Sequence, residues 1–155
     1  MFNIVLYEPE IPPNTGNIIR LCANTGCTLH LIEPLGFELD DKRLRRAGLD
    51  YGEWQDIQRY EDWDRFINQC KVERFWAIST KGTRRHSDAD FAKGDFIVFG
   101  PETRGLPKAL LDAMDKHFIL RIPMLPDSRS MNLSNAASVI VYEAWRHFNF
   151  EGATL

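Results

Sequence analysis

The sequence predicts an α/β fold in which a mostly parallel sheet is flanked by helices. Short apolar runs alternate along the chain with segments of helical periodicity. The apolar runs are nearly continuous, as is typical of parallel strands that are covered on both faces. Glycine or proline marks each expected turn, and neither a repeat nor a long flexible tract divides the chain. We therefore expect one domain over residues 1–155.

The expected strands are short apolar runs, of which the third is the weakest: Phe2–Tyr7, Thr28–Glu33, Ile57–Tyr60, Arg74–Ser79, Phe96–Phe99 and Phe118–Ile122. The expected helices lie between or after them: Asn14–Asn24, Asp40–Ala47, Glu61–Cys70, Pro107–Lys116 and Asn132–Phe148. Gly26 and Gly48 follow the first two helices and predict their ends. In the third helix, apolar side chains recur at helical spacing, at Trp63, Phe66, Ile67 and Cys70.

Length and composition exclude several classes of protein. With 155 residues, 44% of them hydrophobic, the chain can bury one sizeable core, and 26% charged residues is near the globular average. The net charge of −3 argues against a protein that coats nucleic acid without specificity, although it is compatible with a local basic patch. The apolar start is too short for a signal peptide, and no stretch is long enough to span a membrane.

The cysteines and histidines favour a cytoplasmic protein without a metal. Cys22, Cys27 and Cys70 form no C-x-x-C pair and are odd in number, so we expect neither structural zinc nor a disulfide framework. The histidines show no metal-ligand spacing. We therefore expect a protein of the reducing cytoplasm that binds neither a metal nor a membrane.

The most informative segment runs from Ile122 to Trp145 and reads IPMLPDSRSMNLSNAASVIVYEAW. Pro123 and Pro126 hold the backbone extended and prevent a helix there. Small polar residues follow, and a helix rich in Ala, Val and Ile comes after them. Small polar side chains at a helix N-terminus can satisfy a ligand or one another, so we expect this loop to form a pocket wall.

A second segment, from Phe99 to Pro107, ends the fifth expected strand and reads FGPETRGLP. Open backbone at the carboxyl end of a strand is where open α/β sheets bind ligands. The glycine spacing resembles a phosphate loop, but Leu106 and Pro107 stand where that loop requires Lys and Ser or Thr. No G-x-G-x-x-G motif is present either. The pattern indicates a ligand loop and argues against nucleoside triphosphate and dinucleotide binding.

A third segment, from Pro12 to Arg20, follows the first strand directly. Asn14 and Arg20 are six positions apart in it. If the helix begins near Asn14, Arg20 lies on a face that is rotated well away from the helix start. The two residues can nevertheless face one cleft at the top of the sheet.

Together, the motifs NTGNIIR, FGPETRGLP and IPMLPDSRSMNLSNAASVIVYEAWR resemble those of the α/β-knot (SPOUT) methyltransferases in order and spacing. They are most similar to the smallest members, the tRNA ribose 2′-O-methyltransferases that act on the wobble nucleotide. The resemblance extends from Asn3 to about Arg146. It implies a deep C-terminal trefoil knot over roughly residues 75–155, which a sequence pattern alone would never predict because knots are so rare.

The resemblance implies S-adenosyl-L-methionine as the cofactor, bound at the ends of several strands. An adenine needs an apolar slot edged by backbone N–H and C=O groups, and a sulfonium cation is compatible with a nearby glutamate. The alternative is that these segments are ordinary turns of an α/β fold. The expected cofactor-binding residues are Ile78, Ser79, Thr80, Gly100, Glu102, Gly105, Ile122, Met124, Ser130, Met131 and Leu133.

For the reaction, the resemblance assigns activation of the ribose hydroxyl to Arg20, helped by Asn14, Glu102, Ser130 and Asn132. An arginine stays protonated at any ordinary pH and is therefore a poor base. We hypothesise that Arg20 holds the adjacent phosphate and polarises the hydroxyl, whose proton leaves to phosphate or water. The alternative for an isolated arginine is a salt bridge on the surface of its helix.

Two basic clusters are candidates for RNA contact: Lys42, Arg43, Arg45 and Arg46 in an expected helix, and Lys81, Arg84 and Arg85 after an expected cofactor strand. Arg20 joins them as an expected phosphate contact. The alternative for the first cluster is a solvated helix face, on which Asp40 and Asp41 cap the helix or pair with the cations.

The last helix carries apolar residues on more than one face, which is too much apolar surface for the edge of a monomer: Val139, Val141, Tyr142 and Trp145. We expect a homodimer through the first and last helices, as the resemblance also implies. We expect no appended RNA-binding domain, and we therefore expect the dimer itself to recognise the RNA. Each active site would then take residues, Arg20 included, from across the interface.

The expected function is S-adenosyl-L-methionine-dependent methylation of a tRNA ribose 2′-oxygen. By resemblance alone, the target is the wobble nucleotide of leucine tRNAs, a cytidine or a 5-carboxymethylaminomethyluridine. Two alternatives stay open, namely a knotted RNA-binding or ribosome-associated protein without activity, and a 2′-O-methyltransferase of another RNA site. The intact set of polar residues argues against the inactive alternative: Asn14, Arg20, Glu102, Ser130 and Asn132.

Overall fold

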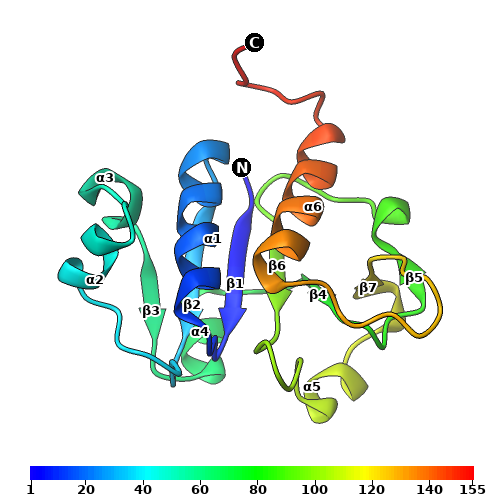
Figure 1. Ribbon diagram of the computed structural model, residues 1–155. Coiled ribbons are helices and arrows are strands. Elements are labelled where there is room, and N and C mark those ends of the chain that lie inside the picture. Colours follow the sequence, from blue (N-terminus) through cyan, green and yellow to red (C-terminus); the bar gives the residue numbers. More distant parts are fainter.

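The computed structural model describes residues Met1–Leu155 and confirms the α/β prediction (Figure 1). One sheet of seven strands has the order β3-β2-β1-β6-β4-β7-β5, and every neighbouring pair is parallel. The strands are β1 Asn3–Tyr7, β2 Thr28–Ile32, β3 Gln58–Tyr60, β4 Phe75–Ile78, β5 Arg84–Arg85, β6 Phe96–Phe99 and β7 Ile119–Arg121.

All the predicted helices are present, and two short 3₁₀ turns accompany them. No helix is both long enough and apolar enough to cross a membrane. The elements are α1 Pro12–Thr25, α2 Asp41–Arg46, α3 Tyr51–Trp54, α4 Trp63–Cys70, α5 Lys108–Asp112 and α6 Leu133–Arg146, with η1 His86–Asp88 and η2 Lys116–Phe118.

Helix α1 begins at Pro12, earlier than the predicted start at Asn14. Pro12 and Pro13 occupy the first helical positions, where a missing N–H costs nothing because those groups have no partner within a helix. The helix ends at Gly26, whose left-handed backbone (φ 72°) lets its N–H donate to the Cys22 carbonyl.

The remaining differences from the predicted elements are local. Helix α5 ends after Asp112 rather than at Lys116, because the Asp115 side chain accepts a hydrogen bond from the His117 N–H and starts the separate turn η2. Helix α3 and strand β5 were not expected. With four and two residues respectively, they are too short to show a periodicity.

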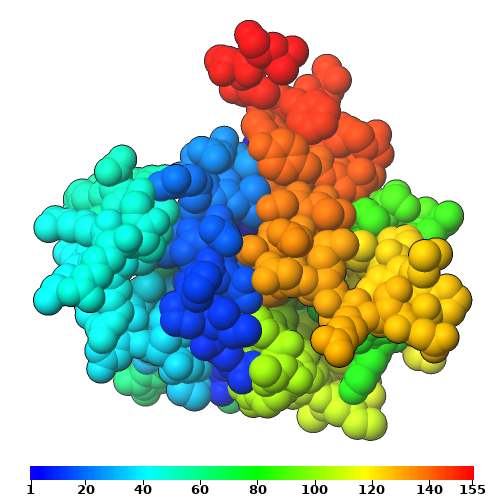
Figure 2. All heavy atoms as spheres, in the orientation of Figure 1, coloured from blue at the N-terminus to red at the C-terminus, as the bar shows by residue number.

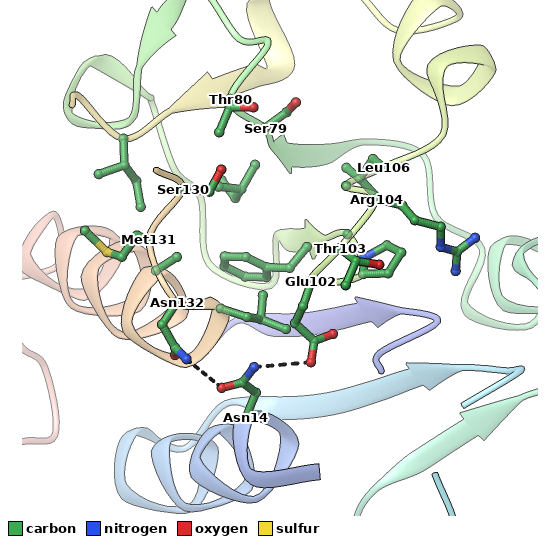
Figure 3. A pocket seen from close by; sticks show the side chains of 18 of the residues that line it. Asn14, Ser79, Thr80, Glu102, Thr103, Arg104, Leu106, Ser130, Met131 and Asn132 are labelled. Carbon is green, nitrogen blue, oxygen red and sulfur yellow. Dashed lines mark hydrogen bonds between the residues drawn. The ribbon is translucent and has the colours of Figure 1, made fainter. Parts of the chain in front are cut away.

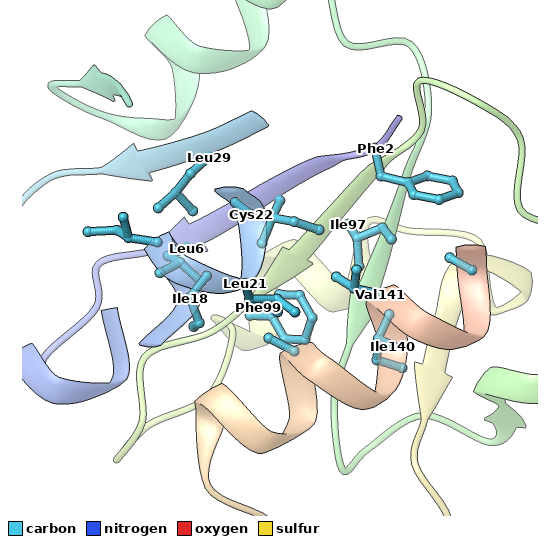
Figure 4. Packing of buried hydrophobic residues seen from close by; sticks show 14 of the residues in the cluster. Phe2, Leu6, Ile18, Leu21, Cys22, Leu29, Ile97, Phe99, Ile140 and Val141 are labelled. Atoms are coloured by element: carbon cyan, nitrogen blue, oxygen red, sulfur yellow. The ribbon is translucent and has the colours of Figure 1, made fainter. Parts of the chain in front are cut away.

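Helices cover both faces of the sheet, and the pleat of β1 divides the core between them. Helices α1 and α6 pack side by side on one face (Figure 1). Leu6 belongs to the cluster on that face, with Ile18 of α1 and Ile140 of α6 (Figure 4). Its neighbour Val5 belongs to a second cluster, with Phe66 of α4. The continuous apolar runs are therefore buried on both faces, as predicted.

The parallel arrangement brings the motif segments together. Strand β6 pairs with β1 on one side and with β4 on the other, and Phe99 is in register with Leu6 and Ile78. Strand β7 follows β4 in the sheet. Because all these strands run in one direction, the loops that follow β1, β4, β6 and β7 meet at one edge of the sheet.

Candidate functional site

A cavity of about 460 Å³ lies at this edge of the sheet. The loops after β4, β6 and β7 line it, together with residues at the starts of α1 and α6. The structure brings every residue selected for cofactor binding to its wall: Ile78, Ser79, Thr80, Gly100, Glu102, Gly105, Ile122, Met124, Ser130, Met131 and Leu133. Three strand ends that are distant in the sequence thus form one site.

The build of this cavity fits S-adenosyl-L-methionine. Its volume is in the range of small-molecule cofactor sites, and apolar side chains make up part of its wall. The loop after β6 folds tightly on itself, since a Cβ at Gly100 would lie 2.3 Å from the Leu106 nitrogen. Gly105 has a positive φ of 68° and donates its N–H to the Pro101 carbonyl at 2.9 Å. Both glycines thus allow the loop to fold tightly at the wall of the cavity.

Polar side chains from three segments form one hydrogen-bonded chain along the cavity (Figure 3). The Asn132 Nδ2 donates to Asn14 Oδ1 at 2.9 Å, and the Asn14 Nδ2 donates to Glu102 Oε2 at 3.2 Å. The Asn132 Oδ1 accepts hydrogen bonds from the N–H groups of Ser134 and Asn135 and so caps α6. Asn14 is only 5% exposed, and both ends of its amide are satisfied. The chain therefore ties the starts of α1 and α6 to the loop after β6.

The Glu102 carboxylate caps the start of α1. Ile11 is the N-cap residue, and its side chain offers no hydrogen bond. Instead, the Ile11 N–H donates to Glu102 Oε2 at 2.7 Å, and the Glu10 N–H donates to Glu102 Oε1 at 2.8 Å. A negative charge at this position also favours the helix dipole. With these bonds and that from Asn14, the carboxylate is engaged as a structural anchor rather than free to act as a base.

Glu10, in the loop before α1, binds the loop after β6 in a similar way. Its carboxylate accepts hydrogen bonds from the N–H of Thr103 at 2.9 Å and from the Thr103 hydroxyl at 2.8 Å. These bonds lower the pKa of Glu10. The loop before α1 and the loop after β6 are thus held together by two carboxylates that point in opposite directions. The motif signal did not include Glu10, because its partner is 93 positions away in the sequence.

The catalytic candidates fall into two groups. Asn14, Glu102, Ser130 and Asn132 all line the cavity, and the Ser130 hydroxyl makes no hydrogen bond within the chain. Arg20 does not line it. Within a single chain, the structure therefore does not bring Asn14 and Arg20 to one cavity. Six residues of α-helix turn through about 600°, which leaves the two side chains roughly 120° apart around the axis.

Arg20 instead lines a second cavity of about 380 Å³, between α1 and the segment Phe37–Leu49. Its guanidinium donates from Nε to Glu53 Oε1 at 2.8 Å and from Nη2 to the Gly48 carbonyl at 2.6 Å. The hydrogen bond and charge of Glu53 raise the pKa of Arg20 above its ordinary value. This environment strengthens the argument that Arg20 cannot serve as a base.

The first basic cluster lies on α2 and is only partly paired. Arg43 forms ion pairs with Glu38 at 2.7 Å and with Asp40 at 2.5 Å. The other cations are exposed and make no ion pair: Lys42, Arg45 and Arg46. Arg43 thus follows the alternative of a paired helix face, and its neighbours remain available for phosphate contacts.

In the second cluster, only Lys81 lines the main cavity. Arg84 donates to the His117 carbonyl at 3.0 Å, and Arg85 pairs with Asp88 at 2.8 Å. Both arginines therefore hold local structure around β5 in addition to any contact with RNA.

Two further cations, which the basic clusters did not include, line the main cavity. They are Arg104 after β6 and Arg121 at the end of β7. Arg121 makes no ion pair, and the nearest carboxylate oxygen to Arg104, on Glu8, is 3.8 Å away. The signal that identifies them is position, since each lies at or just after the end of a strand whose loop was expected to bind a ligand.

Comparison with known proteins gives a consistent result. Residues 1–142 match the SpoU rRNA Methylase family. The chain is 70% identical to the tRNA (cytidine(34)-2′-O)-methyltransferase of Saccharophagus degradans, over 99% of each chain. A solved structure concerned with the 2-OH methylation of C/U34 on tRNA is 42% identical, with a TM-score of 0.87 and coverage of 97% of this chain and 98% of that one. The SpoU methyltransferase AviRb from Streptomyces viridochromogenes, in complex with AdoMet, is 25% identical, with a TM-score of 0.80 and coverage of 97% and 58%.

Proposed function

The chain belongs to the SpoU rRNA methylase family, and from this membership we propose that it is a tRNA ribose 2′-O-methyltransferase that acts on nucleotide 34. S-adenosyl-L-methionine is its cofactor. The observation that carries the proposal is the cavity at the ends of β4, β6 and β7, around which all the expected cofactor residues gather. The substrate is a cytidine or a 5-carboxymethylaminomethyluridine in leucine tRNAs, and the methylation takes place in the cytoplasm.

The residues of the main cavity bind and orient the cofactor. When bound, S-adenosyl-L-methionine supplies a methyl group on a positively charged sulfur, which is a good leaving group. Ile78, Ile122 and Leu133 offer apolar contacts for its base, and the loop between Gly100 and Gly105 offers backbone groups. The hydrogen-bonded chain described above keeps these loops in place, so that the reacting groups meet in a fixed geometry.

Arg20 acts on the substrate by charge and orientation. Its raised pKa keeps it a cation, which can hold the phosphate beside the target ribose and polarise the hydroxyl. The hydroxyl proton leaves to phosphate or water. We assign the carboxylate in the cavity wall, Glu102, a structural role, because it accepts hydrogen bonds from two backbone N–H groups and from Asn14.

The active site is completed in a homodimer. Arg20 and the main cavity belong to different sides of α1 within one chain, so a single chain does not bring them together. Helices α1 and α6 lie side by side at the surface (Figure 2). Exposed apolar side chains accompany them, with Ile11 at 41%, Val139 at 37% and Tyr142 at 46% exposure. In a twofold dimer through these helices, each chain presents Arg20 to the cavity of its partner.

The chain forms one domain with a trefoil knot over roughly residues 75–155. The strand order supports this proposal, because β7 lies between β4 and β5, which precede it in the sequence. A late strand that enters between two earlier neighbours is the kind of connection that a threaded chain produces.

A pair of synthetic anticodon stem-loops tests the function. The two RNAs differ only at nucleotide 34, which carries a ribose 2′-hydroxyl in one and a 2′-hydrogen in the other. We expect methyl transfer from labelled S-adenosyl-L-methionine to the first RNA alone. Equal labelling of both RNAs would contradict the assigned oxygen. Preferred labelling of a ribosomal RNA fragment would favour the alternative substrate, and binding without transfer would favour the inactive RNA-binding protein.

A further inference from the structure

The donors of Arg20 are divided between the chain and solvent. A guanidinium has five N–H groups in a fixed fork. The Nε donates to Glu53 Oε1 at 2.8 Å, and Nη2 contacts Glu53 Oε2 at 3.4 Å and the Gly48 carbonyl at 2.6 Å. All the hydrogen bonds of Arg20 within the chain thus involve Nε and Nη2, and both N–H groups of Nη1 remain free.

Glu53 is itself held in place by the local structure. Its Oε2 accepts a hydrogen bond from the Asp50 N–H at 2.6 Å, as part of a capping box that starts α3. Trp54 is 6% exposed and anchors the same short helix in the core. The Glu53 side chain is 19% exposed, against 50% for Arg20. The carboxylate is therefore a fixed support, and the arginine is the accessible member of the pair.

Arg20 also has open space on one side. It lines the cavity of about 380 Å³ with the polar residues Asn17, Glu38 and Arg43. Glu38 is already paired with Arg43 at 2.7 Å, so it does not compete for the free edge of Arg20. An anion such as a phosphodiester can therefore approach Arg20 without displacing an existing ion pair.

We infer that Glu53 is a positioning residue for methyl transfer, which orients Arg20 so that Nη1 is presented to a phosphodiester of the RNA. This inference rests on the proposed function and names a residue that the motifs do not contain. The same contacts permit an opposite interpretation, in which Glu53 sequesters Arg20 and must release it. The two interpretations differ in sign, because removing the Glu53 charge lowers activity in the first case and raises it in the second.

The test compares Glu53→Gln with the wild-type protein in steady-state methylation of an anticodon stem-loop. We expect kcat/KM for the RNA to fall by about tenfold to a hundredfold, as for a misplaced orienting group, with S-adenosyl-L-methionine affinity unchanged. The matched control is Glu33→Gln, because Glu33 also pairs with an arginine, Arg59, at 2.8 Å but lines neither cavity. The control should retain wild-type kinetics. Increased activity of Glu53→Gln, or activity equal to that of the control, would overturn the inference.

A double-mutant cycle separates positioning from loss of structure. If Glu53 acts through Arg20, then Glu53→Gln should cost little further activity in an Arg20→Lys background, and the two effects should be non-additive. Additive losses would show that Glu53 acts independently of Arg20 and would contradict the inference.

Binding of the 2′-deoxy stem-loop gives a readout without chemistry. Glu53→Gln should weaken this binding by about tenfold, because Nη1 no longer meets the phosphate in a fixed geometry. If the wild-type protein failed to methylate the RNA, the proposed function would be rejected. The affinity of Glu53→Gln for the 2′-deoxy stem-loop would then still test whether Glu53 positions Arg20, and an affinity equal to that of the wild-type protein would reject that role.

Discussion

The main cavity is lined by loops from three strand ends and by the starts of α1 and α6, whereas the cavity beside Arg20 is lined by α1 and the segment Phe37–Leu49. The first is joined by hydrogen bonds between residues that are up to 118 positions apart. The second depends on ion pairs and carbonyl contacts of much shorter range, such as those of Arg20. One region is complete within a chain, and the other presents a cation outward.

Helix α1 connects the two regions. Its start is anchored at the main cavity by Asn14 and Glu102, and Arg20 leaves the same helix in another direction. The position of Arg20 is therefore fixed relative to a cavity that it does not reach. The main cavity and Arg20 therefore lie on different sides of α1 in one chain, which is the arrangement on which the proposed composite site of a dimer rests.

Removal of the Arg20 side chain should distinguish the functions of the two regions most clearly. In Arg20→Ala, methyl transfer should fall by at least about a hundredfold, because a charged group that orients the reacting hydroxyl is lost. Affinity for S-adenosyl-L-methionine, measured by calorimetry, should stay at the wild-type value. A parallel loss of cofactor affinity would mean that Arg20 belongs to the main cavity after all.

Mixed dimers test whether Arg20 and the main cavity of one active site come from different chains. Arg20→Ala and a cavity variant such as Ser130→Ala/Asn132→Ala should each be inactive alone. After they are denatured and refolded together in equal amounts, about half of the dimers are mixed and each has one intact site, so about a quarter of the wild-type activity should return. Tagged mixed dimers can be purified to check this fraction. No recovery of activity in them would place both groups in one chain.

Loss of Asn14 should affect the cofactor side. Asn14→Ala leaves the Asn132 Nδ2 without a partner and removes one of the two hydrogen bonds to Glu102 Oε2, which should lower the free energy of unfolding by about 1–3 kcal/mol. S-adenosyl-L-methionine affinity should fall with it, because the loops are no longer held together. The control is Asn24→Ala, an exposed asparagine of the same helix that makes no side-chain hydrogen bond. Equal urea midpoints for the two variants would show that the chain of hydrogen bonds contributes nothing.

Acid should lower the free energy of unfolding through contacts in both regions, by less than Asn14→Ala does. Hydrogen bonds from Thr103 lower the pKa of Glu10. The pKa of Glu53 is also lowered, and the largest cause is its hydrogen bond with Arg20. A carboxyl whose folded pKa lies below the unfolded value of 4.5 stabilises the protein above that pH, and the contribution is lost as pH falls through the folded pKa. Urea unfolding should therefore become easier below about pH 4.5. Glu10→Gln should remove the part of this pH dependence that comes from the main cavity, and Glu53→Gln should remove the part that comes from the region around Arg20. If the free energy of unfolding of both variants depended on pH as in the wild-type protein, the stabilising role of these two carboxylates would be rejected.

Most of the sheet could be predicted from the sequence because apolar runs are local signals, whereas the residues selected for the main cavity came from the resemblance of three strand-end motifs to a known family. The loops after β4, β6 and β7 meet simply because the strands are parallel. The start of α1 at Pro12 was missed for a local reason too, since two prolines suit the first turn of a helix as well as an extended loop.

The partners of the charged residues could not be predicted. Glu102 is chemically suited to a sulfonium, and nothing in its motif indicates that it caps α1 from 91 positions away. In the same way, the pairing of Arg20 with Glu53 depends on where α3 packs, and α3 is too short for a periodic signal. Long-range contacts of this kind follow from the tertiary fold and not from spacing.

The most direct test is methyl transfer to bulk tRNA from a strain that lacks the gene. The purified protein would be supplied with labelled S-adenosyl-L-methionine, and the labelled nucleotide would then be mapped in the tRNA. We predict label on the ribose 2′-oxygen of nucleotide 34, in leucine tRNAs. Label at another nucleotide would keep the enzyme and contradict its substrate, and no label despite saturable cofactor binding would contradict the account as a whole.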